Sequence, residues 1–418
     1  MSVHQAIREA AADITDELIG WAADLVQIPS VTGDEAAAQK YVADLFAHHG
    51  LGVTVLTPDD GLRDHPSFSD DGLPVNRPVV IGHQPGSTAN ARSLILNGHI
   101  DVVPPGDENL YPHGAWSGAV RDDALWGRGA VDMKAGLLAG LAALATLRRL
   151  DIQPPGDVWI ESVTGEESGG VGTLATVAAG YRADAAVILE PTKLAMCPVG
   201  AGSASFRLHV HGQAAHGAMR TEGHSAITSY FTLHRALQEL ETQRHKGWAH
   251  SAFRADQLVA PISVGRVVSG DWPSTVPELL VAEGRYGVLP GESLRDARAE
   301  FETYLATVAA EDPWLASHPP QVEWFEGQFE PAETPADAQI LQVVAEQHKV
   351  STGHTPISHG VSYGSDLRFF TNDAQMDAVL YGPGDVAVAH TVHEHVPLQD
   401  LKVTVEVIAN LCAQWGVR

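Results

Sequence analysis

The stretch SLILNGHID, residues 93–101, gives the clearest indication of the fold. Its apolar half predicts a buried strand that runs into a polar Asn-Gly pair and then His99. Two more apolar runs, residues 158–163 and 186–189, predict further buried strands. A helix is expected between the first two, over residues 131–150. Strands that alternate with helices predict an α/β fold with a mostly parallel sheet flanked by helices.

The residues just past these strands carry side chains suited to a site. His99 follows the first strand, Glu166 the second and Glu190 the third. Ligands of a parallel sheet bind at the carboxyl ends of its strands, so all three side chains fall where such a fold places its site.

The N-terminal segments predict helices and a loop. Residues 5–27 carry apolar side chains at helical spacing. Thr32 and Glu35 resemble a capping box that opens a second helix over about 33–48. Residues 57–78, rich in Asp, Pro and Gly, predict a surface loop.

The middle of the chain shows a different pattern. Strands are predicted near 205–211, 280–288 and 322–325, with helices over 225–242 and 291–309. The order strand-helix-strand-strand-helix-strand indicates a small α+β sandwich inserted into the first domain. We therefore expect a catalytic domain in two parts, residues 1–202 and 329–418, and an inserted domain over 203–328.

Composition argues against several classes of protein. The 418 residues include 26 basic and 52 acidic side chains, a formal charge of −26 that would repel nucleic acid and anionic membranes. This charge favours solubility; adaptation to high salt is the alternative. The two cysteines, Cys197 and Cys412, form neither a disulfide framework nor a zinc-finger pattern, which fits a reducing cytoplasm.

Neither a targeting nor a membrane segment is expected. The first nine residues lack a basic-then-apolar signal pattern. The longest apolar run, residues 135–147, is shorter than the roughly 18 residues of a membrane span and is followed by Arg148 and Arg149. It predicts a buried core helix, and we expect a cytoplasmic protein.

Five polar clusters point to a metal site, and the first two contain His99 and Asp132. Residues two apart in a strand face the same way, so His99 and Asp101 could reach one region together. Asp132 lies in GRGAVDMKAG, residues 127–136, where a loop leads into the predicted helix. It could be an N-cap, or a carboxylate that bridges two cations.

The other three clusters add carboxylates and histidines. Glu166 and Glu167 stand side by side in a Gly-rich loop, which could be a solvated turn. Adjacent carboxylates repel unless a cation or a proton intervenes, so one could bind metal while the other handles protons. Glu190 directly follows an apolar run and would need a buried partner. Near the C-terminus stand three histidines, His390, His393 and His395, each of which could also be structural.

Joined together, these clusters supply His, Asp, Glu, Glu and His. That mixture suits zinc, with cobalt or manganese as substitutes. Two metals roughly 3.5–4 Å apart, bridged by a carboxylate, can share one water, lower its pKa and polarise a carbonyl.

In this order, the five clusters resemble the family of two-zinc deacylases and peptidases. That family includes acetylornithine deacetylase, succinyl-diaminopimelate desuccinylase, aminoacylase and glutamate carboxypeptidase, and the resemblance covers nearly the whole chain. It implies a zinc-exopeptidase-like catalytic domain with an inserted lid. It also implies two Zn²⁺ ions, with Co²⁺ or Mn²⁺ as substitutes.

The resemblance assigns a role to each residue of the clusters. His99 and Glu190 would bind the first metal, Glu167 and His390 the second, and Asp132 both. Asp101 would orient His99 or support Glu166. Glu166 would be the general base and then the general acid.

The inserted domain resembles the family's lid, which commonly also mediates dimerisation, so a homodimer through this domain is expected. The segment GQAAHG, residues 212–217, resembles the lid motif whose histidine reaches an active site, in several relatives that of the partner subunit. His216 would then stabilise the oxyanion; otherwise it is a loop histidine. Relatives often carry Asn-Val-Val-Pro where this chain has STVP, residues 274–277, so Ser274 would hold substrate with a shorter reach.

Three further residues are candidates for substrate binding. Arg368, in GSDLR, resembles the family residue that holds the substrate's carboxylate, a group that a guanidinium binds bidentately. Gly384 resembles a turn whose backbone approaches the substrate. Arg285 is a weaker candidate, since it could pair with Glu283 or another acid of the inserted domain.

We therefore expect a metal-dependent hydrolase that cleaves the amide bond of an N-acyl amino acid or similar small acylated amine through a metal-bridging water. A dipeptidase or carboxypeptidase, or a deformylase of a heterocyclic amine, would use the same machinery. A non-catalytic metal-binding protein would have lost a ligand or the base. All five ligand positions and Glu166 are present.

Overall fold

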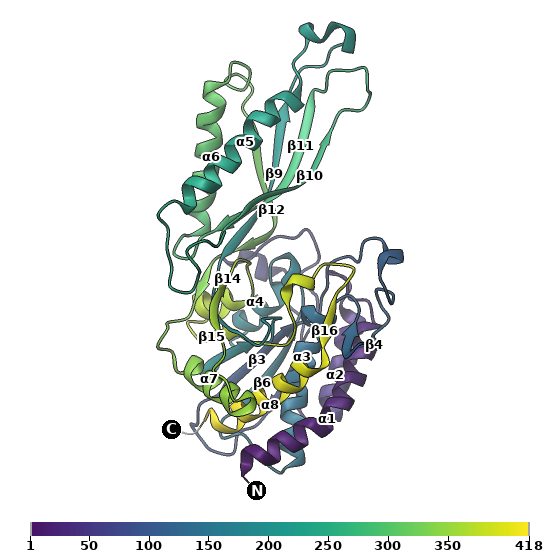
Figure 1. Cartoon of the computed structure of the whole chain (residues 1–418), viewed down its shortest axis with the longest axis vertical. Coiled ribbons are helices and arrows are strands. Elements are labelled where there is room, and N and C mark those ends of the chain that lie inside the picture. Colours follow the sequence, from purple (N-terminus) through teal and green to yellow (C-terminus); the bar gives the residue numbers. More distant parts are fainter. Residues whose placement is uncertain (1, 417–418) are drawn as a thin grey trace. The chain divides into compact units, whose positions relative to one another are not determined.

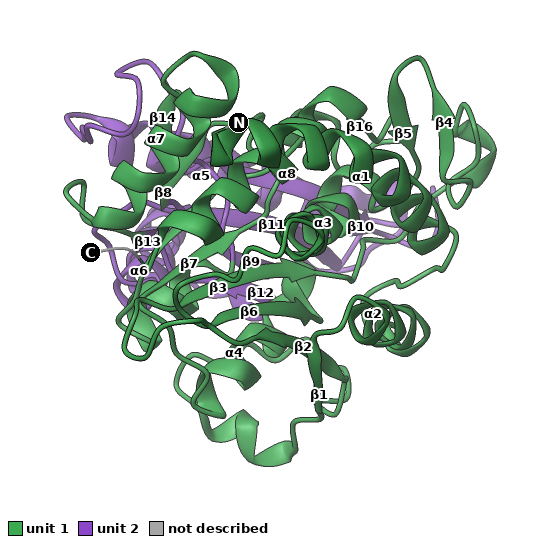
Figure 2. Cartoon of the chain, turned by 90° about the horizontal axis from the view of Figure 1, so that it is seen from below, with its two compact units in different colours: residues 1–199, 333–359, 366–418 green, residues 200–332, 360–365 purple. Residues whose placement is uncertain are grey.

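The computed structural model describes residues 2–416 and divides the chain into two compact units (Figure 2). Unit 1 comprises Met1–Val199, Glu333–His359 and Asp366–Arg418. Unit 2 comprises Gly200–Ala332 and Gly360–Ser365. The short segment 360–365 carries no sequence signal of its own that would assign it to unit 2.

Unit 1 is built on a nine-stranded sheet. Along it the strand order is β1-β2-β6-β3-β7-β15-β8-β13, and β14 also pairs with β8. The strands are β1 (Gly52–Leu56), β2 (Val79–Gln84), β3 (Leu94–His99), β6 (Val158–Val163), β7 (Ala185–Ile188), β8 (Met196–Gly200), β13 (Ala332–Glu333), β14 (Ser358–Val361) and β15 (Asp377–Leu380).

The four central strands, β6, β3, β7 and β15, are parallel to one another. The pairings beside them, β2 with β6 and β15 with β8, are antiparallel. Because β3, β6 and β7 are parallel, their carboxyl ends meet at one edge of the sheet. The predicted α/β class is confirmed, although β2 was not anticipated from the sequence.

Helices cover both faces of this sheet. They are α1 (Val3–Val26), α2 (Ala36–His48), α3 (Ala135–Arg149), α4 (Val171–Ala178), α7 (Gln339–Thr352) and α8 (Leu398–Gln414). Short helical turns are η1 (Asp60–Asp64), η2 (Glu108–Leu110), η3 (Ala130–Lys134), η4 (Glu166–Ser168), η6 (Phe369–Asp373) and η7 (Val386–Val388). A separate three-stranded sheet consists of β4 (Ala119–Arg121), β5 (Ala124–Trp126) and β16 (His395–Pro397), in the order β16-β5-β4.

Helix α3 lies at the centre of unit 1, packed against α1, α8 and the sheet. A Cβ atom on Gly136 would lie 2.1 Å from the carbonyl oxygen of Leu189, so glycine permits the close approach. The segment Ala130–Arg149 is long and apolar enough to cross a membrane, but its apolar part is buried in the protein and only its end, at Arg148 and Arg149, is exposed. It is therefore the core helix that the sequence predicts.

Unit 2 is a four-stranded antiparallel sheet with two helices on one face (Figure 1). Its strands are β9 (Gly202–His211), β10 (Ile262–Ser269), β11 (Leu279–Val288) and β12 (Gln321–Phe329), in the order β10-β11-β9-β12. Helices α5 (Ala226–His245) and α6 (Leu294–Glu311) cover it, and η5 (Gly217–Glu222) follows β9. Phe206, Tyr286 and Phe301 form its aromatic core, with ring centroids 4.8 and 4.9 Å apart.

The capping box predicted for Thr32 and Glu35 is wrong. Glu35 occupies the N-cap position of α2, but no side chain caps that helix. The Thr32 hydroxyl instead donates to the Asp101 carboxylate, 3.1 Å away. The Glu35 carboxylate accepts from the Gly33 N–H and pairs with buried Arg77. The local cap does not form because both side chains are engaged by residues distant in the sequence, Thr32 by Asp101 and Glu35 by Arg77.

A buried carboxylate within the sheet generates a prediction on stability. Glu161 of β6 accepts a hydrogen bond from Asn97 Nδ2 at 3.2 Å, and burial raises its pKa to about 7. The folded chain therefore keeps a proton that the unfolded chain loses above pH 4.5, so this group lowers stability as pH rises from about 4.5 to 7.

We expect E161Q to reduce the loss of stability between pH 5 and pH 8 by on the order of 1 kcal/mol, because glutamine stays neutral. Urea unfolding of wild type and variant at both pH values measures it. E346Q, at an exposed position, is the control. An unchanged pH slope in E161Q would contradict the prediction.

Candidate metal centre

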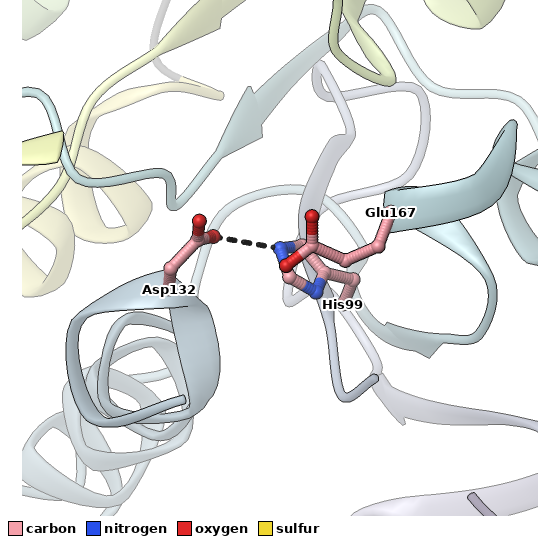
Figure 3. Close-up of side chains that lie close together, drawn as sticks. All are labelled: His99, Asp132 and Glu167. Atoms are coloured by element: carbon pink, nitrogen blue, oxygen red, sulfur yellow. Dashed lines mark hydrogen bonds and ion pairs between the residues drawn. The ribbon is translucent and has the colours of Figure 1, made fainter. Parts of the chain in front are cut away.

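Three of the predicted ligands point at one another at the carboxyl edge of the unit 1 sheet: His99, Asp132 and Glu167 (Figure 3). The ring Nε2 of His99 lies 2.9 Å from Asp132 Oδ1 and 3.8 Å from Glu190 Oε1. With Glu190, these ligands come from four different segments of the chain. His99 is fully buried at the end of β3.

Asp132 lies between two histidines. Its Oδ1 faces His99, and its Oδ2 lies 3.3 Å from Nε2 of His390. The same His390 nitrogen lies 3.1 Å from the Glu167 carboxylate. The Asp132 carboxylate thus presents one oxygen to the pair His99 and Glu190, and its other oxygen to the pair His390 and Glu167.

The backbone around Asp132 explains its position. Asp132 has φ −122° and ψ 94° inside η3, and its peptide bond to Met133 is cis. Lys134 stands at the N-cap position of α3. The N-cap alternative for Asp132 is therefore wrong, and its carboxylate is available to the cluster.

Asp101 holds two parts of the cluster at once. Its backbone carbonyl accepts a hydrogen bond from Nδ1 of His99 at 2.9 Å, so the other ring nitrogen is left to face the acidic residues. Its carboxylate oxygens accept from the backbone N–H groups of Glu166 and Glu167, each at 3.2 Å. The geometry is compatible with both roles considered for Asp101, but the bond to His99 comes from the backbone carbonyl, since the Asp101 carboxylate lies 3.6 Å from Nδ1.

The electrostatics of the cluster call for positive charge. Burial raises the pKa of Glu166 and Glu190 well above their usual range, and neighbouring carboxylates add to the effect. Hydrogen bonds to Asp132 and Glu167 raise the pKa of His390 to about 10. Buried carboxylates that crowd one another are stable as anions only with cations among them.

The donor set fits divalent metals. Two groups of side chains have ligand atoms within 4.8 Å of one another, and they share His99. One group is His99, Asp132 and Glu167, and the other is His99, Glu166 and Glu190. Imidazole nitrogens and carboxylate oxygens in such a set suit zinc, cobalt or manganese. Glu166 itself lies within reach of a ligand position.

Of the three C-terminal histidines, His390 is the one turned toward the cluster. It adopts φ 60°, and its side chain is 51% exposed. His395 instead stacks on Trp126, with ring centroids 4.4 Å apart, and donates from Nδ1 to the carbonyl of His393. The residue pattern left all three histidines open, and the family resemblance singled out His390, the one that lies beside Asp132 and Glu167.

Two of the predicted substrate residues lie in unit 1. Arg368 is buried, stacks on Phe369 and donates to the carbonyl of Gly169 at 2.6 Å. It thereby supports the turn that follows Glu166 and Glu167. Gly384 has φ +79°, and a Cβ there would lie 2.3 Å from Val131, so the turn needs glycine.

Unit 2 holds the other two, Ser274 and Arg285, together with His216, the predicted oxyanion-stabilising residue. His216 is exposed, and its Nδ1 accepts from the N–H of Ala218 at 3.1 Å. Ser274 lies beside it, because Gly217 donates to the carbonyl of Ser274 at 2.6 Å. Arg285 donates to the carbonyl of Ser362 at 2.8 Å. The alternative partner considered for Arg285, Glu283, pairs with Arg207 and Arg266 instead.

Sequence reasoning missed two residues that touch the Asp132 loop. Arg128 and Glu394 form a buried ion pair, and Glu394 also accepts from the backbone N–H of Asp132 at 3.3 Å. Both stand within clusters noted for other residues. Two features of the sequence could have pointed to them. Arg128 is a charged residue between two glycines, and Glu394 is an acid between two histidines.

The fold and the site together define a metal-dependent hydrolase. Residues 95–414 match the protein family described as Peptidase family M20/M25/M40, which is more than half of the chain, so the chain belongs to this family. The predicted family resemblance and the predicted class, a hydrolase acting on amide bonds, are confirmed.

Relatives with different substrates resemble the chain. N-formyl-4-amino-5-aminomethyl-2-methylpyrimidine deformylase of Halalkalibacterium halodurans is 29% identical over 361 residues, which are 81% of this chain and 83% of that protein. Acetylornithine deacetylase of Myxococcus xanthus is 29% identical over 357 residues, 83% of this chain and 86% of that protein. The structure of the di-peptidase Dug1p from Saccharomyces cerevisiae has a TM-score of 0.80 at 14% identity, covering 100% of both chains.

The position of Asp132 generates a prediction on metal binding. Zinc should raise the melting temperature of the metal-free protein, because a ligand that binds only the folded chain stabilises it. The free energy of unfolding rises by about 3 kcal/mol when the ligand is at 100 times its Kd. D132A should lose most of this gain, since Asp132 reaches both donor groups.

Thermal unfolding with and without zinc measures the effect. D107A is the control, because Asp107 is an exposed acid that bonds only within its own turn. A zinc-induced shift in D132A equal to that of D107A would contradict the assignment of Asp132.

Proposed function

We propose that the chain is a two-metal hydrolase that removes a small acyl group from an amino compound. The observation that carries the proposal is Asp132, whose two oxygens face His99 and His390 separately. His99 and Glu190 would hold one metal, Glu167 and His390 the other, and Asp132 both. Zinc is the proposed metal, with cobalt or manganese as substitutes.

Two divalent cations held by these residues would lower the pKa of a water and polarise the amide carbonyl. Glu166 then serves as general base and general acid. It accepts the proton of the attacking water on its carboxylate and delivers it to the leaving nitrogen. Burial raises the pKa of Glu166, which suits a carboxyl group that must carry a proton between the two steps.

His216 is proposed to stabilise the oxyanion. Its Nδ1 accepts a backbone N–H, so the proton of the neutral ring is on Nε2, which can donate. A preorganised donor of this kind stabilises the negative charge that develops on the carbonyl oxygen.

Removal of a small acyl group is preferred over peptide cleavage on sequence identity. The deformylase and the deacetylase are each 29% identical to this chain, against 25% for a probable carboxypeptidase of Aspergillus niger. A dipeptidase or carboxypeptidase remains the second candidate. Ser274, Arg285, Gly384 and Arg368 are proposed to contact the substrate or to support its pocket. The formal charge of −26 supports a protein that avoids nucleic acid and membranes, and the cytoplasm is its proposed compartment.

A homodimer through unit 2 is also proposed. Strand β10 is an edge strand, and an edge strand presents unpaired backbone groups. Val267 and Val268 on this strand and Trp272 beyond it are exposed, Trp272 by 69%. Val268, Trp272 and Leu279 line one hollow that a second copy could cover. Val267, the neighbour of Val268, faces the other side of the sheet.

Replacing the proposed base tests the mechanism. E166Q should retain wild-type zinc content and lose about 10²- to 10⁴-fold in kcat, because glutamine cannot accept the proton. Steady-state kinetics together with metal analysis measure both quantities. E346Q, at an exposed position, is the control.

Near-normal turnover in E166Q would reject the role of base. Loss of zinc along with activity would instead make Glu166 a ligand. The substrate class is tested with the zinc-loaded enzyme on acetyl-, formyl- and succinyl-amines and on dipeptides. Preference for dipeptides would reject deacylation.

The dimer is tested by V268K, which should shift the protein from dimer to monomer in light scattering, because a lysine on an edge strand opposes pairing. L110K, at an apolar side chain of unit 1 that is 62% exposed, is the control. A monomeric wild type, or a dimeric V268K, would contradict the proposed interface.

A further inference from the structure

The Arg128–Glu394 ion pair lies between two segments that carry proposed metal ligands. Arg128 stands four residues before Asp132, and Glu394 stands four residues after His390. The two side chains are 3% and 1% exposed and form a very short ion pair. Neither residue has a role in the function proposed above.

Glu394 makes more contacts than the ion pair alone. Its Oε1 accepts from the backbone N–H groups of Val131 and Asp132, each at 3.3 Å. Its backbone carbonyl accepts from the N–H of Gly127 at 3.2 Å. A single residue of the His390 segment thus contacts both sides of the Asp132 loop.

Strand pairing continues this connection. Residues 395–397 of β16 pair with residues 124–126 of β5, His395 opposite Trp126. Between His390 and Glu394, the Thr391 hydroxyl donates to the carbonyl of Val388 at 2.7 Å and accepts from the N–H of His393 at 3.2 Å. Hydrogen bonds and strand pairing therefore connect the segment that carries His390 to the loop that carries Asp132.

We propose that Arg128 and Glu394 are positioning residues that set the separation between Asp132 and His390, and so the affinity for the second metal. The first metal depends less on them, because His99 and Glu190 follow strands of the central sheet. This inference rests on the proposed two-metal function. Partners that orient metal ligands typically change metal affinity by about 10- to 100-fold when removed.

The test is calorimetric titration of metal-free protein with zinc in a competing chelator, with metal content measured after dialysis. E394Q keeps the size of the side chain but loses its charge. We expect its second zinc to bind about 10- to 100-fold more weakly, and its first by less than about threefold. E292Q is the matched control, because Glu292 pairs with Arg244 and accepts from the Leu289 N–H within unit 2.

A second variant separates positioning from stability. R128M/E394L removes both charges, so it should melt at a higher temperature than E394L, in which Arg128 is left buried and unpaired. Its second zinc should still bind weakly, because the two N–H groups have lost their acceptor. Where E394L fails to fold, E394Q and the double variant carry the comparison.

Three results would overturn the inference: wild-type affinities for both zinc ions in E394Q, recovery of the second affinity in R128M/E394L, or an equal change in E292Q. Fewer than two zinc ions bound by the wild-type protein would overturn the two-metal function itself. Stoichiometry in the wild type and the affinity ratio in the variants therefore report on separate claims.

Discussion

Four carboxylates, those of Asp132, Glu166, Glu167 and Glu190, are crowded at one edge of the unit 1 sheet with very little access to water. Burial and mutual repulsion both disfavour four negative charges in such a place. Two histidines offset part of this, but the arrangement is stable as a set of anions only around cations. The rest of unit 1 serves to hold these side chains together in spite of that repulsion.

The supports come from several layers of the fold. Parallel strands bring His99, Glu166 and Glu190 to one edge because their carboxyl ends coincide. Asp101 then fixes both His99 and the Glu166–Glu167 turn, and Thr32 in turn donates to Asp101. Glu394 ties the Asp132 loop to the segment of His390. The Glu166–Glu167 turn and the Asp132 loop are thus each held by hydrogen bonds from a distant part of the chain.

The chemistry follows from this arrangement of charge. Burial raises the pKa of Glu166, and a carboxyl group of this kind suits the role of proton carrier proposed for it. The same site would serve an acetyl, a formyl or a peptidyl amide, because all three share the carbonyl and the leaving nitrogen. Discrimination among them belongs to residues outside the metal cluster.

The sequence by itself determined the α/β class, the central helix and the identity of the clustered side chains. These depend on apolar periodicity and on residue types at strand ends, such as His99 and Glu190, which local sequence records. Only the tertiary structure decided that Thr32 and Glu35 support the site instead of capping a helix, and that Arg368 is turned to Gly169. It also decided that Glu394 reaches Asp132. Such contacts join residues up to hundreds of positions apart, and a hydrogen bond between distant segments leaves no period in the sequence.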